Sequence, residues 1–138
     1  MSRVLPARAY RAGAFTIPQN AWTRMPLDTL VWDTGGDFEL PGYVCPVGAF
    51  YHVIGQMSCV ATIGTETIGV AIYRNGASIC VAGGTTPLSS GLQGILATDV
   101  IRCSIGDVLE LWAFTDANNG QALTIRPDGN YLTIASAV

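Results

Sequence analysis

The 138-residue chain has no lysine, and its seven cationic side chains are all arginines. Charged residues make up only 12% of the sequence, against about 25% in an average soluble domain. The formal net charge of −3 disfavours a basic surface for nucleic acid. The longest stretch without a charge, from Leu40 to Thr65, is broken by prolines and glycines, whereas a spanning helix needs about 20 continuous apolar residues. We expect neither nucleic-acid binding nor insertion into a membrane.

Residues for catalysis are also scarce. His52 is the single histidine, and no Gly-x-Ser-x-Gly motif accompanies it, so a hydrolase is disfavoured. The ten acidic residues show no pair that stands out as a glycosidase couple. There is no phosphate loop and no Asp-x-Asp-x-Asp-Gly loop. We predict that the chain is not an enzyme and needs no cofactor or resident metal. Two segments, 116–119 and 128–130, could offer oxygen ligands to calcium, but they are better explained as solvated turns.

The cysteines Cys45, Cys59, Cys80 and Cys103 are widely spaced, without a Cys-x-x-Cys pair. This spacing disfavours zinc. All four lie in or beside β-rich runs, where cysteine packs well as a small apolar residue. Free thiols are favoured, and up to two disulfides remain open.

The hydrophobic content, 49%, is high for so few charges. A single domain of this length still exposes about 30% of its unfolded-chain surface, where charges normally lie. We therefore expect a second buried surface, and hence an oligomer. The alternative is a monomer with an uncharged Ser/Thr/Asn/Gly surface.

The sequence predicts an all-β fold, because short β-rich runs alternate with turn residues and no 3.6-residue period is sustained. Asn75-Gly76 predicts a tight hairpin, and Asn119-Gly120 repeats the signal. A turn is expected at 127–130, with Gly129 supplying a positive φ, and loops at 35–36 and 83–84. Regular strands without helices favour a sandwich or barrel. The expected strands lie near Ala7–Arg11, Arg24–Leu27, Tyr43–Pro46, Phe50–Ile63, Thr67–Arg74, Ser78–Ala82, Gln93–Arg102, Val108–Thr115, Ala122–Arg126 and Tyr131–Ala137.

Several of these strands are apolar on both faces. In the Phe50–Ile63 strand, Tyr51, Val53 and Met57 alternate with Phe50, His52, Ile54 and Gln56. In the last strand, Leu132 and Ile134 alternate with Tyr131 and Thr133. A strand with one wet face should instead alternate apolar with polar. A second subunit on the outer face would explain the pattern, and covering loops are the alternative.

Four segments, in order, resemble signatures of the TNF-like jelly rolls, especially the complement-type globular heads. They are the Gly42–Val53 strand–turn–strand, the Val70–Gly76 hairpin, the Gly106–Trp112 strand and the closing Asn130–Ile134 strand. The resemblance implies a ten-stranded antiparallel jelly-roll sandwich over residues 7–138, preceded by an arm at 1–6 and assembled as a homotrimer. One sheet, carrying the first and last strands and Phe50–Ile63, would face the three-fold axis. The candidate interface residues are Phe50, Tyr51, His52, Ile54, Gln56, Tyr131 and Thr133. Three copies of His52 near the axis could also gather a metal or anion, although a packed histidine is favoured.

The resemblance is nearest to short bacteriophage and bacterial heads, which four further features also suit: Ala9-Tyr10-Arg11, Ile17-Pro18, Trp22-Thr23 and Phe38. Met1–Ala14 lacks a signal-peptide pattern, and no collagen-like stalk is present. We therefore expect a non-enzymatic virion structural protein, assembled in the host cytoplasm, that decorates and stabilises a bacteriophage capsid beside other virion proteins. A tail-tip or fibre head that binds a host-surface glycan is the alternative, and it is less favoured because little chain is spare for attachment. A secreted bacterial lectin-like module is a third class.

Overall fold

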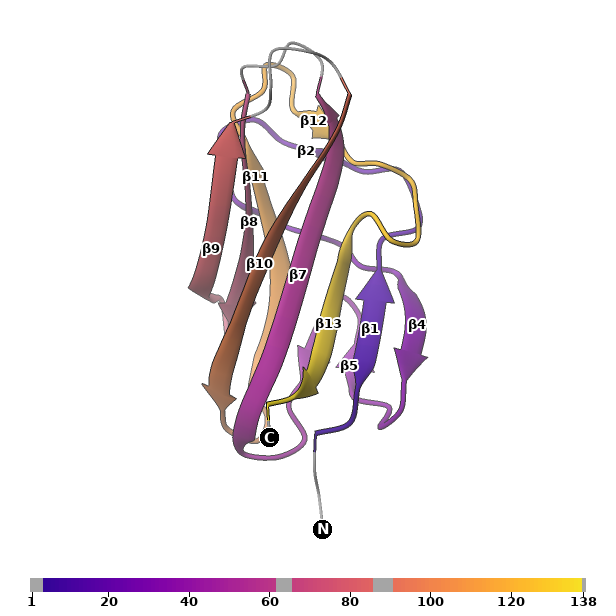
Figure 1. The fold of residues 1–138 in the computed structure, drawn as a ribbon, viewed down its shortest axis with the longest axis vertical. Coiled ribbons are helices and arrows are strands. Elements are labelled where there is room, and N and C mark those ends of the chain that lie inside the picture. The colour runs from indigo at the N-terminus through magenta and orange to yellow at the C-terminus, as the bar shows by residue number, and fades with distance from the viewer. Residues whose placement is uncertain (1–3, 62–65, 86–90, 138) are drawn as a thin grey trace.

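Two antiparallel sheets packed face to face form the molecule (Figure 1), and the computed structural model describes residues 4–61, 66–85 and 91–137. The first sheet has the order β10-β7-β13-β1-β4 and is called the β7 sheet here. Its strands are β10 (Gly91–Cys103), β7 (Ala49–Ala61), β13 (Tyr131–Ser136), β1 (Ala7–Tyr10) and β4 (Thr29–Asp33).

The second sheet, called the β8 sheet, has the order β5-β6-β11-β8-β9 and adds β3 beside β11. A separate short ladder joins β12 to β2. The strands of these two sets are β5 (Phe38–Glu39), β6 (Gly42–Val44), β11 (Val108–Thr115), β8 (Thr67–Arg74), β9 (Ala77–Thr85), β3 (Thr23–Arg24), β12 (Gln121–Ala122) and β2 (Thr16–Ile17).

The core lies between the sheets and follows the two-residue period of the strands. Along β11, every second residue is buried, Leu109 and Leu111 completely. From the facing sheet, Tyr51, Met57 and Leu132 are equally buried. The described ranges contain no helix that is long and apolar enough to cross a membrane.

The all-β jelly-roll prediction is confirmed, including the placement of the first strand, the last strand and the Phe50 strand in one sheet. At the β8–β9 hairpin, Asn75 and Gly76 have φ of 52° and 82°, as the Asn-Gly pair predicts. β1 runs antiparallel to β13, with Ala7 opposite Ile134. The beginning of the first core strand therefore lies beside the end of the last one.

Several local predictions are wrong. β4 was not predicted, and the runs at 24–27 and 122–126 contribute only short strands. Gly83 and Gly84 lie inside β9, where Gly83 pairs with Gly69, because glycine satisfies the ladder through its backbone alone. Val4, assigned from sequence to a loose arm, is buried in the core.

Candidate subunit interface on the β7 sheet

The face of the β7 sheet that points away from the core is called the outer face here, and strand register builds it row by row. In the central row, Ile54 of β7 lies between Thr98 of β10 and Thr133 of β13. The row continues through Arg8 of β1 to Trp32 of β4. Because directly opposed residues point to the same side of a sheet, these five side chains share one face.

Parallel rows extend the outer face in both directions. One row contains Leu96, Gln56, Tyr131 and Tyr10. On the other side, Val100 and His52 stand opposite each other, followed by Arg102 and Phe50. Several of the largest apolar residues are open to solvent. The exposed fractions are 52% for Val100, 51% for Phe50, 46% for Leu96 and 43% for Trp32.

These four exposed apolar groups thus lie on three strands of one sheet face, β10, β7 and β4. Isolated exposed apolar residues are ordinary, but contiguous ones mark interaction surfaces. The mixed character of this face, with threonines, a glutamine and tyrosines between aliphatic groups, is typical of a subunit contact.

Six of the seven residues predicted for the trimer interface lie on the outer face: Phe50, His52, Ile54, Gln56, Tyr131 and Thr133. The placement of Tyr51 with them is wrong. Its side chain points into the sandwich and is fully buried, with its hydroxyl donating a hydrogen bond to the Val47 carbonyl. Burial raises the pKa of Tyr51 to about 12. That the other six contact a neighbouring subunit stays a prediction.

Arg8 sits near the middle of the outer face between two aromatic rings. Its Cζ is 4.1 Å from the Tyr131 ring centroid and 5.2 Å from that of Trp32. Its Nε donates a hydrogen bond of 2.7 Å to Thr133 Oγ1. A guanidinium over aromatic faces is held in place by cation–π attraction and is partly shielded from water. The rings therefore fix a positive charge at a defined position on this face.

The charge on the outer face has one sign. The described residues that the register places there include the cations Arg8 and Arg102, but no aspartate or glutamate. Three ion pairs are formed by the described residues, and they link Arg11 with Asp28, Arg24 with Glu110 and Arg126 with Asp128. None involves Arg8, so this face presents a cation without a carboxylate partner in the described part of its own chain.

His52 does not form a catalytic arrangement with its neighbours in the described ranges. Its Nε2 lies 3.1 Å from Thr98 Oγ1, and the residues opposite it are Val100 and Ala135. Beside the Thr98 hydroxyl, a general base would also need an acid that orients its ring, and the two residues opposite His52 are apolar. Its position on the outer face leaves the proposed ring of three histidines open.

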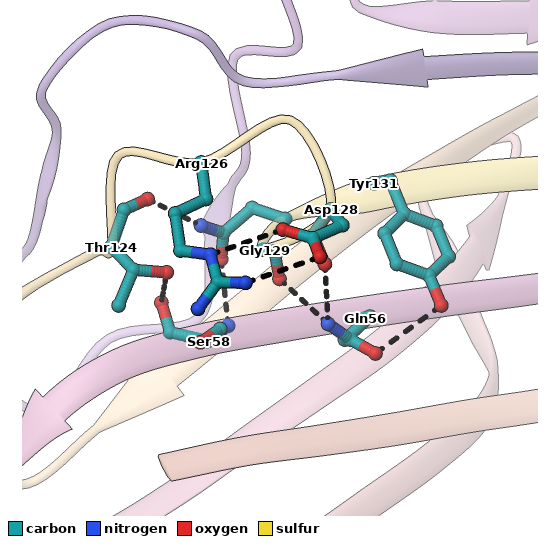
Figure 2. A network of polar contacts seen from close by, with 8 residues as sticks. Gln56, Ser58, Thr124, Arg126, Asp128, Gly129 and Tyr131 are labelled. Carbon is teal, nitrogen blue, oxygen red and sulfur yellow. Dashed lines mark hydrogen bonds and ion pairs between the residues drawn. The ribbon is translucent and has the colours of Figure 1, made fainter. Parts of the chain in front are cut away.

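A loop between β12 and β13 covers one end of the outer face, and Figure 2 shows the contacts that hold it. Gln56 Nε2 donates to the carbonyls of Asp128 and Gly129, at 2.9 and 3.0 Å, and the Tyr131 hydroxyl donates to Gln56 Oε1 at 3.2 Å. Arg126 pairs with Asp128 above β7. Among the described residues, this loop covers the outer face at the end near Gln56 and Ser58, and Phe50 at the other end of β7 is 51% exposed.

Asn130 anchors the base of the same loop and is completely buried. Its Nδ2 donates to the Thr124 carbonyl, and its Oδ1 accepts the Ser58 backbone N–H at 2.7 Å. The turn predicted at 127–130 is present, but Gly129 does not have a positive φ. A Cβ there would lie 2.7 Å from Thr124 Oγ1, so close approach rather than backbone freedom explains the glycine. The network was not predicted from the sequence, because Asn130 is distinguished from other turn asparagines only by its burial.

The four cysteines are present as free thiols. The thiols of Cys45 and Cys103 are hydrogen-bonded to each other, which raises the pKa of Cys45 and lowers that of Cys103. Burial raises the pKa of Cys59 to about 11.

Among the described residues, no group of three or more His, Cys, Asp or Glu could hold a metal ion. In the first proposed calcium segment, Asp116 accepts the Thr67 backbone N–H. In the second, Asp128 pairs with Arg126.

Comparison with known proteins finds similarity in structure only. No family model matches the sequence, and no curated protein matches it. The globular domain of zebrafish complement 1qA protein aligns with a TM-score of 0.68 and 11% identity, over 96% of this chain and 97% of that one. Murine APRIL gives a TM-score of 0.70 at 14% identity, over 94% and 95%. Eiger TNF from S. frugiperda gives 0.65 at 12% identity, over 97% and 94%. The chain thus has the TNF-like jelly-roll fold over nearly its whole length.

Proposed function

We propose that this chain is a non-enzymatic structural protein that works as a homotrimer with the outer face of the β7 sheet at the subunit contacts. The observation that carries the proposal is the exposure of Phe50, Leu96, Val100 and Trp32 on one sheet face. Burying such a surface yields about 25 cal/mol per Å2 of apolar area. Three copies around a shared axis would cover these faces together.

The biological setting of the proposed trimer is a virus particle assembled in the host cytoplasm, where it would decorate the capsid beside other virion proteins. Support comes from the sequence segments that resemble short bacteriophage heads. A trimer also matches the local three-fold positions that an icosahedral shell offers. Imaging intact particles that carry this chain would test the setting. Three-lobed density on the shell is expected, and density confined to the tail would contradict a capsid role.

Light scattering on the purified chain at micromolar concentration tests the assembly. We expect a mass three times the 14.5 kDa of one chain. A monomer at that concentration would contradict the proposal, because the outer face would then be stable in water.

A second candidate, binding of a host-surface glycan, is favoured by an aromatic strip on the solvent side of the β8 sheet. Trp112 stacks on Tyr73, with centroids 4.3 Å apart and planes 8° apart. Trp22 packs on Phe114 at 5.5 Å. If the β7 sheet is buried between subunits, this strip lies on the exterior of the trimer. Aromatic rings offer apolar surface that can pack against sugar rings, beside polar groups such as Glu110.

A glycan array probed with the purified protein and with Trp112→Ala tests this candidate. Binding by the parent that falls at least tenfold in the variant is expected for a receptor-binding head. No binding by the parent to any sugar on the array would leave capsid decoration as the function.

A further inference from the structure

Cys45 and Cys103 come from different sheets and meet in the core at one pole of the sandwich. Cys103 is the last residue of β10, in the β7 sheet, and Cys45 directly follows β6, in the β8 sheet. β10 ends at the pole where the chain also ends (Figure 1). Each cysteine is only 1% exposed, and the two thiols are hydrogen-bonded to each other. The pair therefore connects the two sheets through side chains inside the sandwich.

Backbone hydrogen bonds hold the two cysteines in this arrangement. The Cys45 N–H donates to the Asp107 carbonyl, and the Cys45 carbonyl accepts the Gly106 N–H, both at 2.8 Å. Both partners lie in the turn that directly follows Cys103. That turn is itself closed by the Asp107 N–H, which donates to the Ser104 carbonyl at 3.1 Å. The turn that begins at Cys103 is thus fastened to the backbone of Cys45, which keeps the two sulfur atoms close.

The other two cysteines are not hydrogen-bonded to a thiol in the described part of the chain. The Cys80 thiol donates to the Thr98 carbonyl, with 3.6 Å between Sγ and oxygen. Cys59 is completely buried, and burial followed by the Glu66 charge raises its pKa to about 11. A disulfide forms only where two sulfur atoms can approach to about 2.05 Å. Cys45 and Cys103 are the two thiols that the fold places for such a bond.

Cys103 is the more reactive thiol of the pair. The hydrogen bond from Cys45, and after it the neighbouring Arg74 guanidinium, outweigh burial and lower the pKa of Cys103. Arg74 is held there by a hydrogen bond of 2.7 Å from its Nη1 to the Arg102 carbonyl. The turn after Cys103 is open to solvent, with Ile105 74% exposed. Local opening of this turn therefore gives a small reagent access to the thiolate.

We propose that Cys45 and Cys103 form an intramolecular disulfide when the protein meets a low-molecular-weight disulfide such as oxidised glutathione. The Cys103 thiolate attacks one sulfur of the reagent, forms a mixed disulfide and releases one glutathione thiolate. Cys45 then attacks the Cys103 sulfur, closes the protein disulfide and releases the second thiolate. The two cysteines lose two electrons to the S–S bond of the reagent, and their protons go to the released thiolates.

The disulfide fastens the β7 sheet to the β8 sheet covalently. It links positions 58 residues apart (103 − 45), so it restricts the unfolded chain strongly, whereas the folded chain already holds the sulfur atoms together. For a domain of this size, the melting temperature should rise by about 10 °C. The bond lies in the core of one chain, so this inference does not depend on the proposed trimer.

Oxidation in a glutathione buffer tests the pair. The parent is compared with Cys80→Ala, which removes the half-exposed thiol, and with Cys80→Ala proteins that also carry Cys45→Ala, Cys103→Ala or Cys59→Ala. Intact mass spectrometry distinguishes an internal disulfide, which removes two hydrogens, from a mixed disulfide, which adds a glutathione. Cys80→Ala alone and the matched control with Cys59→Ala should lose two hydrogens. The proteins with Cys45→Ala or Cys103→Ala should form no internal disulfide.

Peptide mapping of the oxidised parent without reduction should give a linked Cys45–Cys103 peptide, and dithiothreitol should reverse the rise in melting temperature. Linkage of another pair would overturn the proposal, as would four free thiols in a parent whose local opening is promoted by mild urea. If circular dichroism shows that an alanine variant is unfolded, the map of the parent decides alone. Light scattering separates this test from the proposed function, because a monomeric parent that forms the disulfide contradicts only the trimer.

Discussion

At the residue scale, two glycines show how one backbone conformation can matter differently in two places. Gly76 and Gly120 both have φ of 82°, a region that side chains with a Cβ rarely adopt. A Cβ on Gly76 would meet nothing within 4 Å, whereas one on Gly120 would collide with the backbone carbonyl oxygen of Ile17. Position 76 requires only a left-handed backbone conformation, whereas position 120 also requires that no Cβ be present beside the Ile17 carbonyl.

We therefore expect unequal effects from the same substitution. Gly76→Ala should lower the free energy of unfolding by about 1 kcal/mol, the usual strain of a left-handed alanine. Gly120→Ala should lower it by about 3 kcal/mol, because strain and steric overlap combine. Urea denaturation followed by tryptophan fluorescence measures both. Equal losses would mean that the β2–β12 ladder beside Gly120 moves aside without cost.

At the scale of the element, the inward side chains of β7 form the core, and its outward side chains form part of the outer face. Its residues alternate between the core and the outer face, so neighbouring positions in sequence have different functions. Met57 is completely buried, and Ile54 is partly exposed in the central row of the outer face.

Aspartate at these two positions should separate folding from assembly. Met57→Asp places an unpaired charge in the core and should cost about 4 kcal/mol or more, enough to unfold many domains. Ile54→Asp leaves the core intact, so the chain should still fold, but the buried charge at the proposed contact should prevent it from forming the trimer. Circular dichroism reports the first effect, and light scattering reports the second. A trimeric Ile54→Asp protein would contradict the placement of the contact.

A second element, the β8–β9 hairpin, is joined to the turn before β11 by side chains. Asn75 Nδ2 donates to Asp107 Oδ1 at 2.9 Å, and Asn75 Oδ1 accepts the Val108 N–H. Asp107 also accepts the Ser104 N–H. The hydrogen bond from Asn75, followed by the one from Ser104, lowers the pKa of Asp107 below its ordinary value.

The sign of this shift gives a pH prediction. A lowered pKa means that the ionised carboxylate stabilises the fold above the ordinary value near 3.8, and that the contribution is lost as pH falls through the lowered value. Asp107→Asn should melt at a lower temperature than the parent at pH 7, and the difference should vanish near pH 2. A constant difference across this range would mean that the charge of Asp107 has no role.

Much of the architecture could be predicted from sequence because the strands with the strongest two-residue period form its core. Asn75-Gly76 and the alternation along Val108–Thr115 determine their local structure by themselves. β4 could not be predicted, because Leu30, Val31 and Trp32 are all exposed at an edge and show no alternation. For the site, the outward residues of β7 were predictable, but Arg8 was not, since its place beside Trp32 depends on a pairing of distant strands.

At the scale of the whole molecule, buried phenols limit stability in alkali. Burial raises the pKa of Tyr51 to about 12, and burial followed by the Asp37 charge raises that of Tyr43 further. Their neutral forms therefore stabilise the fold fully below the ordinary tyrosine pKa of 10, and this stability is lost as pH rises through the folded-state values.

The melting temperature should accordingly fall steeply between pH 10 and pH 12. The ultraviolet band of ionised tyrosine should rise in two stages, the second coinciding with unfolding. Tyr51→Phe should reduce the amplitude of the second stage. A single stage with no loss of structure would contradict the burial of Tyr43 and Tyr51 in the core.

The antiparallel pairing of Ala7 with Ile134 has a consequence for how this molecule can be attached to anything larger. Both ends of the core leave from one pole, as Figure 1 shows. A tether or fusion partner at either end would emerge there, and the opposite pole would stay unobstructed. In a three-fold ring, three such tethers would leave in parallel, so the molecule could serve as an adaptor with one anchored end and one displayed end.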